Sequence, residues 1–179
     1  DDTCEYCRTG RYNICPGVDF MATQPNYKGA LTQYMTHPEE WTYHIPEGMT
    51  TMEGALVEPA AVGMHAAVLG GAQPGKSIVI LGGGTIGLMV LQACISLGAT
   101  DITVVDVIEK RLELAKKLGA ARVINGKEEE TVAVLRSEEM YGDHGVDLVF
   151  EAAGAVFTAQ QAVQIVSRGG KIMMVGTQS

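Results

Sequence analysis

The chain has 179 residues, of which 46% are hydrophobic and 19% are charged. That hydrophobic fraction supports a packed core, so global disorder is excluded. Lys and Arg total 13, Asp and Glu total 21, and the formal net charge is −8. Binding to nucleic-acid phosphates or to an anionic membrane surface needs a basic balance, so both kinds of partner are disfavoured.

Residues 1–50 differ in composition from the rest of the chain. They hold three of the four Cys and four of the six Pro, and their hydrophobic periodicity is poor. Short extended segments such as 29–35 are interrupted by Pro38 and Pro46. Because proline removes a backbone donor from a strand, this region is predicted to contain loops and short strands.

Three cysteines near the start, Cys4, Cys7 and Cys15, follow a C-x2-C-x7-C spacing. The first residues carry neither a basic nor an apolar stretch of the kind found in secretory signals, so a cytoplasmic location is expected. In that setting the spacing favours thiolate metal ligands over disulfides, and three thiolates suit tetrahedral zinc. Asp1 could supply a fourth, oxygen ligand. The alternative is free or oxidised thiols, and Cys94 is expected in the core.

A helix of small residues is predicted to open at Glu58-Pro59, because proline is favoured in the first turn of a helix. It runs to Gly70-Gly71 and is followed by a turn at Pro74-Gly75. We therefore divide the chain into residues 1–50, a connecting helix within 51–75, and a domain at 76–179.

From residue 76 onward, apolar strands alternate with helices. Strands are predicted at 77–81, 102–105, 122–124, 147–150 and 171–175, and helices at 86–97, 109–118, 128–140 and 157–167. This alternation predicts a parallel sheet covered on both faces, which is a Rossmann-type doubly wound α/β fold with strand order 3-2-1-4-5. The uncharged stretch 77–100 is long enough to span a membrane, but its glycine run favours strand, turn and helix.

A glycine-rich loop joins the first strand of this domain to the first helix. Gly82, Gly84 and Gly87 fit G-x-G-x-x-G, and Asp106 follows at the end of the second strand. In this context the pattern predicts a dinucleotide site. Gly82 permits the tight turn, Gly84 lets the backbone approach the pyrophosphate, and Gly87 allows close packing of helix and strand.

The remaining parts of the predicted cofactor site lie around this loop. The helix start at Thr85 and Ile86 offers N–H groups to phosphates. Asp106 can accept hydrogen bonds from ribose hydroxyls and would repel a 2′-phosphate, which favours NAD over NADP. Arg111 could reach the adenosine side. The alternatives are a non-binding turn or a methyltransferase loop, with Asp106 as a loop cap and Arg111 in a solvated position on its helix.

These segments together resemble the medium-chain, zinc-dependent alcohol and polyol dehydrogenases. Residues 4–16 look like the structural zinc lobe of that family, and residues 54–66 look like the segment leading into its cofactor domain. The glycine loop, Asp106 and residues 151–154 continue the likeness over essentially the whole chain. It is greatest to the sorbitol and xylitol dehydrogenase branch.

The resemblance implies a function and a set of roles. The expected activity is oxidation of a secondary alcohol of a small polyol, with zinc polarising the hydroxyl and NAD accepting hydride. Glu58 corresponds to a glutamate that binds the catalytic zinc or holds its water. Val175, Gly176 and Thr177 would lie against the nicotinamide half. The alternative for Glu58 is a purely structural role, as a carboxylate favoured at a helix N-terminus.

The chain also departs from the family pattern. The first of four lobe cysteines is replaced by Asp1, and the family's Cys and His-Glu for the catalytic zinc belong to a region before this sequence. Residues 1–50 are then part of a β-rich catalytic domain, and 76–179 are an NAD-binding domain without its sixth strand. The chain alone is expected to be inactive and to associate as a homo-oligomer. Alternatives are a non-catalytic dinucleotide-binding fragment and a threonine or simple alcohol dehydrogenase.

Overall fold

The computed structural model describes residues 3–18, 21 and 29–177. By its internal contacts the chain divides into two compact units, Asp1–Pro46 and Glu47–Ser179. Each unit is described below by itself.

The first unit contains only short helical turns in its described residues: α1 (Glu5–Arg8) and two 3-10 helices, η1 (Tyr12–Ile14) and η2 (Glu39–Trp41). The rings of Tyr12 and Trp41 pack edge to face, with centroids 5.6 Å apart. The short strands expected here are absent from residues 3–18, 21 and 29–46, so that prediction is wrong for the described part. The segment around residue 32 makes local turn bonds, from Thr32 N to the Ala30 carbonyl and from the Thr32 hydroxyl to the Tyr34 carbonyl.

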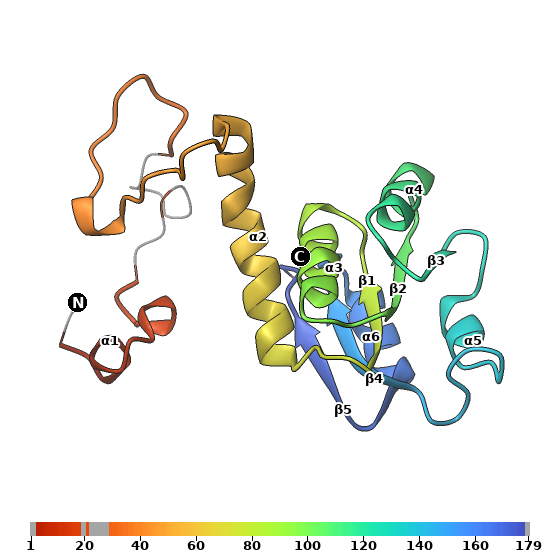
Figure 1. Ribbon diagram of the computed structural model, residues 1–179. Helices are drawn as coiled ribbons and strands as arrows, with labels where there is room; N and C mark the ends of the chain where they lie inside the picture. The colour runs from red at the N-terminus through yellow and green to blue at the C-terminus, as the bar shows by residue number, and fades with distance from the viewer. Residues whose placement is uncertain (1–2, 19–20, 22–28, 178–179) are drawn as a thin grey trace. The chain divides into compact units, whose positions relative to one another are not determined.

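The second unit begins with the long helix α2 (Thr51–Gly70) (Figure 1). The prediction that this helix opens at Glu58-Pro59 is wrong, because Pro59 lies inside it. Its start is fixed by a capping box, in which Thr50 accepts from Glu53 N and the Glu53 carboxylate accepts from Thr50 N at 2.8 Å. This arrangement satisfies two N–H groups that the first helical turn would leave unpaired. Gly71, with φ of +80°, ends the helix.

A five-stranded parallel sheet forms the centre of this unit. Its strands are β1 (Ser77–Leu81), β2 (Asp101–Asp106), β3 (Arg122–Asn125), β4 (Val146–Glu151) and β5 (Val166–Met174). The strand order β3-β2-β1-β4-β5 confirms the predicted topology. The uncharged stretch 77–100 forms β1 and α3, and no helix in the described residues is long and apolar enough to cross a membrane.

Helices connect these strands as the sequence predicts, with two differences. The helices are α3 (Thr85–Ser96), α4 (Glu109–Lys117), α5 (Thr131–Leu135) and α6 (Val156–Ile165). The helix predicted at 128–140 is only α5, because the Arg136 side chain that follows it donates to the carbonyls of Asp143 and Gln164, which lie beyond the helix.

The second difference concerns the start of β5. The predicted helix at 157–167 ends at Ile165, and Gly169-Gly170 lies within β5 rather than between helix and strand. A Cβ at Gly170 would lie 2.8 Å from Ser167 Oγ and 2.9 Å from the Asp147 carbonyl oxygen. Glycine therefore lets the irregular start of β5 run close to β4.

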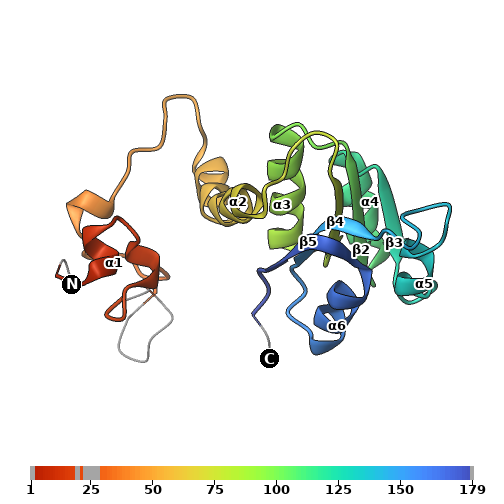
Figure 2. The same ribbon diagram turned by 90° about the horizontal axis from the view of Figure 1, so that it is seen from below.

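Helices cover both faces of the sheet (Figure 2). Ile78 and Ile80 pack on one face in a core shared with α2, α3 and α4, whereas Val79 and Leu81 pack on the other with α5 and α6. All four strand side chains are fully buried. This two-sided burial explains why the strands read as continuous apolar runs.

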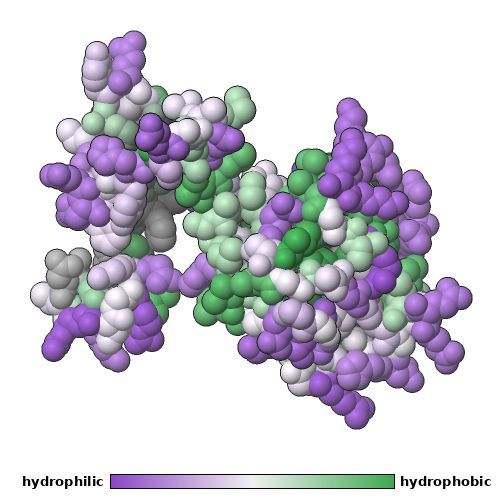
Figure 3. Space-filling view, viewed as in Figure 1, coloured by the Kyte–Doolittle hydropathy of each residue, from purple (hydrophilic) through white to green (hydrophobic). Residues whose placement is uncertain are grey.

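Helices α2 and α3 approach each other closely. A Cβ at Gly63 of α2 would lie 2.5 Å from the Met89 carbonyl carbon of α3. The exposed surface over these two helices is largely apolar (Figure 3). A groove there is lined by residues of α2, α3 and the end of α4, among them Leu56, Val57 and Leu88.

Candidate functional site

A cavity of about 460 Å³ lies at the carboxyl ends of β1, β2 and β4. It is lined by Leu81, Gly82, Gly84, Val105, Asp106, Val107, Arg111, Gly126, Thr131, Ala152, Ala153, Ala155, Phe157, Thr158 and Gln161. In an open α/β sheet, ligands bind in the crevice where the strand order reverses, which here is between β1 and β4. The cavity brings together four of the predicted cofactor residues, Gly82, Gly84, Asp106 and Arg111.

The conformation of the glycine loop requires glycine at two of its three glycine positions. Gly82 has a φ of +107°, and a Cβ there would lie 2.7 Å from Ala153 N. A Cβ at Gly87 would collide with the Gly82 carbonyl oxygen. Gly84 is different, because a Cβ there meets no heavy atom within 4 Å among the described residues. Two of the glycines are thus required by packing, and the third borders open space.

Gly84 is also the residue at which helix α3 begins. No side chain of the described residues caps this helix N-terminus. The N–H groups of the first turn, at Thr85 and Ile86, therefore remain available to an anion. Thr85, Ile86 and Gly87 are not among the residues that line the cavity, and Gly87 serves the packing of α3 on the loop.

Asp106 holds the loop and the end of β2 together. Its Oδ2 accepts from Gly83 N at 2.7 Å, and its Oδ1 accepts from Val107 N at 2.8 Å and Ile108 N at 2.9 Å. The residue is 8% exposed. Asp106 therefore acts as a loop cap, and the same residue lines the cavity.

Arg111 lies on α4 beside this carboxylate. Its NH1 is 3.3 Å from Asp106 Oδ2, and its side chain is about half exposed. The guanidinium thus partly neutralises the one acidic side chain that lines the cavity.

The opposite wall of the cavity comes from the end of β4 and the start of α6. It includes Ala152, Ala153, Ala155, Phe157 and Thr158, none of which was assigned a role from sequence. Their position in the sequence could have identified them as lining the site, since these residues directly follow a predicted strand of the parallel sheet. The same signal marks Gly126 and Thr131 after β3.

The segment predicted to contact nicotinamide lies beside this wall. Val175 N and Gly176 N both donate to the Glu151 carbonyl oxygen, at 2.8 and 2.9 Å. A Cβ at Gly154 would lie 2.5 Å from the Thr177 carbonyl oxygen. Val175, Gly176 and Thr177 do not line the cavity themselves. They are held against the turn after β4, which does line it.

The three N-terminal cysteines form a compact cluster in the first unit. Their sulfurs lie within 4.8 Å of one another, and the Cys4 and Cys15 sulfurs are 3.7 Å apart. Tetrahedral zinc with Zn–S bonds of about 2.3 Å places sulfurs about 3.8 Å apart, so the spacing fits zinc. Asp1, the predicted fourth ligand, lies outside the described residues.

The surroundings of this cluster favour a bound cation. Cys7 N lies 3.4 Å from Cys4 Sγ, and this hydrogen bond lowers the pKa of the Cys4 thiol. Burial and the two neighbouring sulfurs raise the pKa of Cys7 to about 12. A divalent metal ion would supply the positive charge that stabilises neighbouring thiolates in such a cluster.

Glu58 lies in the middle of α2 and is exposed. Its alternative interpretation, a carboxylate at a helix N-terminus, is wrong, because Glu53 holds that position. Within the described residues, Cys4, Cys7 and Cys15 are the only group of three or more potential metal ligands brought together. Glu58 therefore belongs to no such group among the described residues.

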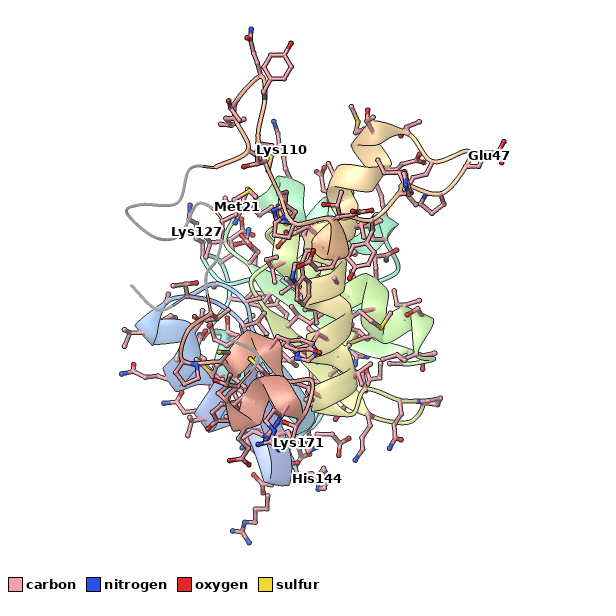
Figure 4. All side chains as sticks on the ribbon, turned by 90° about the vertical axis from the view of Figure 1, so that its left-hand side faces the viewer. Met21, Glu47, Lys110, Lys127, His144 and Lys171 are labelled. Carbon is pink, nitrogen blue, oxygen red and sulfur yellow. The ribbon has the colours of Figure 1, made fainter. Side chains whose placement is uncertain are left out.

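A second cavity, of about 410 Å³, lies at the amino ends of β1 and β4. Its charged lining residues are Lys76, Asp147, Arg168 and Lys171, and His144 borders it too; Figure 4 labels Lys171 and His144 at this end of the molecule. Lys76 is paired with Asp147 at 3.2 Å. None of the predicted site residues lies here.

A family model described as "Zinc-binding dehydrogenase" matches residues 85–179, which is more than half of the chain. The chain belongs to the zinc-binding dehydrogenases. This agrees with the predicted resemblance, and the Rossmann-type sheet is the dinucleotide-binding fold of that family.

Relatives among known zinc-binding dehydrogenases are similar to the chain over nearly all of its length. It is 64% identical over 174 residues to the uncharacterized zinc-type alcohol dehydrogenase-like protein YdjJ of Escherichia coli, covering 97% of this chain and 50% of that protein. It is 42% identical over 176 residues to a sorbitol dehydrogenase of Bacillus subtilis, covering 98% of this chain and 49% of the relative. The chain thus spans about half the length of the curated relatives it matches.

A solved structure supports the same fold. The chain matches a zinc-binding dehydrogenase from Sinorhizobium meliloti, bound to NADP, with a TM-score of 0.92 and 28% identity. The match covers 99% of this chain and 52% of that one.

Proposed function

We propose that this chain is the nucleotide-binding half of a dehydrogenase that uses NAD to oxidise a secondary alcohol of a polyol. The observation that carries the proposal is the cavity at the carboxyl ends of β1, β2 and β4. Gly84, which borders open space, and the buried carboxylate of Asp106 line it, and the uncapped N-terminus of α3 follows directly after Gly84. These features match the needs of a pyrophosphate and of ribose hydroxyls.

NAD is favoured over NADP by the placement of charge. Asp106 is buried at the cavity edge, where a ribose 2′-phosphate would meet its negative charge. Arg111 offsets part of this charge, and a relative of 28% identity was solved with NADP, so the preference needs a direct test.

When bound, zinc would act as a Lewis acid on the alcohol oxygen, and nicotinamide would accept the hydride. Glu58 is proposed to hold that metal or its water, and Cys4, Cys7 and Cys15 to hold a structural zinc. The polyol substrate is supported by the sorbitol dehydrogenase relative.

The cofactor assignment is tested by calorimetry with NAD and NADP on the chain and on Asp106→Asn. The expected result is tighter binding of NAD to the unmodified chain. The variant should bind NAD more weakly and discriminate less, because the charge that repels a 2′-phosphate is gone. Equal affinities for both cofactors, unchanged in the variant, would reject the role of Asp106.

The substrate assignment is tested by NADH formation with sorbitol, xylitol and a simple secondary alcohol, with zinc present. We expect the chain alone to bind NAD without turnover, since Glu58 belongs to no group of three potential metal ligands among the described residues. A chain extended at both ends should oxidise the polyols faster than the simple alcohol. Zinc-dependent turnover by the chain alone would overturn the expectation of inactivity, and a preference for the simple alcohol would reject the polyol assignment.

A homo-oligomer and a cytoplasmic location complete the proposal. All four cysteines are free, which suits a reducing compartment. Sedimentation and cell fractionation test these two points.

A further inference from the structure

The cavity at the amino ends of β1 and β4 carries an excess of positive charge. Three cations, Lys76, Arg168 and Lys171, and one anion, Asp147, line it, so with His144 counted as neutral two positive charges are in excess. The chain as a whole has a net charge of −8. Lys76 and Asp147 form an ion pair at 3.2 Å. The excess therefore belongs to Arg168 and Lys171, neither of which takes part in an ion pair within the described residues.

An irregularity in β5 brings these two cations to one cavity. Four residues of β5, 167–170, stand opposite the single residue Asp147 of β4. Gly169, with a φ of +79°, lies in this bulge. In an uninterrupted strand, residues three apart lie on opposite faces, so the bulge is what allows Arg168 and Lys171 to line the same space. Bulges of this kind re-aim side chains and are common beside functional sites.

A buried hydroxyl in the same bulge has no partner in the described part of the protein. Ser167 is 7% exposed and lines the cavity. Its hydroxyl makes no hydrogen bond with the described residues, and among them no fully enclosed side-chain nitrogen or oxygen lacks a partner. The Ser167 oxygen is therefore open to the cavity that the residue lines. There it can donate to an oxygen of a ligand.

Lys171 has a structural explanation that the other groups do not share. Its Nζ lies 3.7 Å from the place of a Cβ at Gly71, which ends α2, and a cation is favoured at a helix C-terminus. That explanation accounts for one positive charge. It does not account for Arg168, for the Ser167 hydroxyl or for a volume of about 410 Å³, which is typical of small-molecule sites.

We propose that this cavity binds a soluble phosphate monoester through Arg168, Lys171 and Ser167. At neutral pH a phosphate monoester carries about two negative charges, which match the excess positive charge of the lining. Its terminal oxygens accept hydrogen bonds, and arginine and lysine are the usual donors to phosphate.

This site is separate from the cofactor cavity. The two cavities lie at opposite ends of β4, which has six residues and is therefore about 17 Å long. The inference is thus independent of the proposed function, and a phosphate monoester and a dinucleotide can be bound at the same time.

Calorimetry with glycerol 3-phosphate at low salt tests the site. We expect one site per chain with a Kd at or below roughly 1 mM. Arg168→Gln and Lys171→Gln should each weaken binding roughly fivefold, and together at least roughly twentyfold, because each removes a charge-assisted hydrogen bond. Asp147→Asn should instead tighten binding, since it releases Lys76 and removes the one negative charge of the lining.

Matched controls separate this site from general charge and from the cofactor cavity. Lys116 and Lys117 are exposed on α4, and replacing both with Gln changes the net charge as much as replacing Arg168 and Lys171 does. Arg111→Gln removes the cation that lines the cofactor cavity. Both controls should change the affinity for glycerol 3-phosphate less than roughly twofold.

Two further ligands identify the chemistry that is recognised. Dimethyl phosphate, a diester with one negative charge, should bind more weakly than the monoester, and equal affinity would reject the monoester assignment. Vesicles containing phosphatidic acid present the same phosphate group on a lipid. Binding to these vesicles without binding to glycerol 3-phosphate would assign the site to a lipid and overturn the proposal.

The variants decide where the probe binds. The proposal is overturned if no saturable binding appears by roughly 10 mM, ten times the expected Kd. It is overturned equally if the Lys116 and Lys117 double variant loses as much affinity as the Arg168 and Lys171 double variant, or if the loss is confined to Arg111→Gln. Weaker binding in a folded Asp147→Asn would also contradict it.

Discussion

At Gly84 and Gly87 the same substitution meets two different surroundings. A methyl group at Gly84 enters open space, whereas at Gly87 it meets the Gly82 carbonyl oxygen. We expect Gly84→Ala to leave the free energy of unfolding within about 0.5 kcal/mol of the parent. Its NAD affinity should nevertheless fall at least roughly tenfold, because the methyl group occupies the space that the pyrophosphate needs.

Gly87→Ala should instead affect the stability of the fold. It should lower the free energy of unfolding by about 1–3 kcal/mol, since α3 must shift away from the loop. Urea unfolding and calorimetry on both variants check the pair. Equal loss of stability in the two variants would contradict the assignment of Gly84 to the ligand.

The pH dependence of stability should report on Asp147. Burial alone would raise the pKa of this carboxyl, but hydrogen bonds from Ser77 and Lys76 outweigh burial, and the pKa lies below its ordinary value. A carboxyl whose folded pKa is lowered stabilises the protein above its unfolded pKa, near 4, and this contribution disappears as the pH falls through the folded pKa.

The corresponding variant is Asp147→Asn. It should lower the free energy of unfolding by roughly 1–2 kcal/mol at pH 7, and the difference from the parent should shrink below about pH 4. Urea unfolding of the variant and the parent between pH 7 and pH 3 measures this difference in the free energy of unfolding. A difference that stays constant over that range would show that the charge of Asp147 contributes nothing.

Between elements, the contact of α2 with α3 depends on one glycine. Alanine normally stabilises a helix by up to about 1 kcal/mol relative to glycine. At Gly63 we expect the reverse, a loss of about 1–3 kcal/mol, because the new methyl group meets the Met89 backbone. Ala61→Ser, at an exposed position of the same helix, is the control and should change stability by less than about 0.5 kcal/mol. Thermal unfolding of both variants tests this, and a stabilised Gly63→Ala would show that the helices separate easily.

The cysteine cluster and Cys94 should respond differently to a chelator. Cys94 of α3 is fully buried in the core, so a reagent in solution does not reach its thiol. Removing zinc should expose three thiols, those of Cys4, Cys7 and Cys15, to a chromogenic disulfide reagent. Replacing these three with Ser should abolish zinc binding. Zinc content that survives this replacement would place the metal elsewhere.

The start of α2 and the length of α5 show where sequence reasoning stops at the scale of elements. Helix α2 is apolar over much of its exposed surface, so periodicity marks no boundary, and the proline at position 59 suggested a false one. The informative signal was local, the Thr50 and Glu53 capping box. Helix α5 ends early because Arg136 bonds carbonyls of Asp143 and Gln164, which are contacts that no local pattern predicts.

For the molecule as a whole, the sheet order and the glycine-loop side of the cavity were predictable from sequence. Alternating strands and helices set the order, and the spacing from Gly82 to Asp106 identified one wall. The other wall, around Ala153 and Thr158, is built through Glu151 from segments distant in sequence. Its residues are ordinary in type, so only the assembled fold identifies them.

Hydrogen exchange should register NAD and zinc in separate parts of the chain. At a concentration of 100 times its Kd, a ligand stabilises the folded form by about 2.7 kcal/mol. NAD should therefore slow exchange in the segments lining the cavity, including 82–88 and 152–158. Zinc should slow exchange in 4–17. Slowing of 4–17 by NAD in zinc-free protein would contradict this separation.

Strand β1 has consequences for how the chain folds. Ile78 pairs with Ile102 on one side and with Leu148 on the other, so the central strand has one near neighbour in sequence and one remote neighbour. During synthesis from the N-terminus, β1, β2 and β3 emerge first, and the second edge of β1 stays without a partner until β4 appears. In that interval an apolar strand edge is open to wrong pairing, which is when a chaperone would be needed. The two cavity walls also arise at different times, so a dinucleotide can bind only after β4 has joined the sheet and can stabilise only that final state.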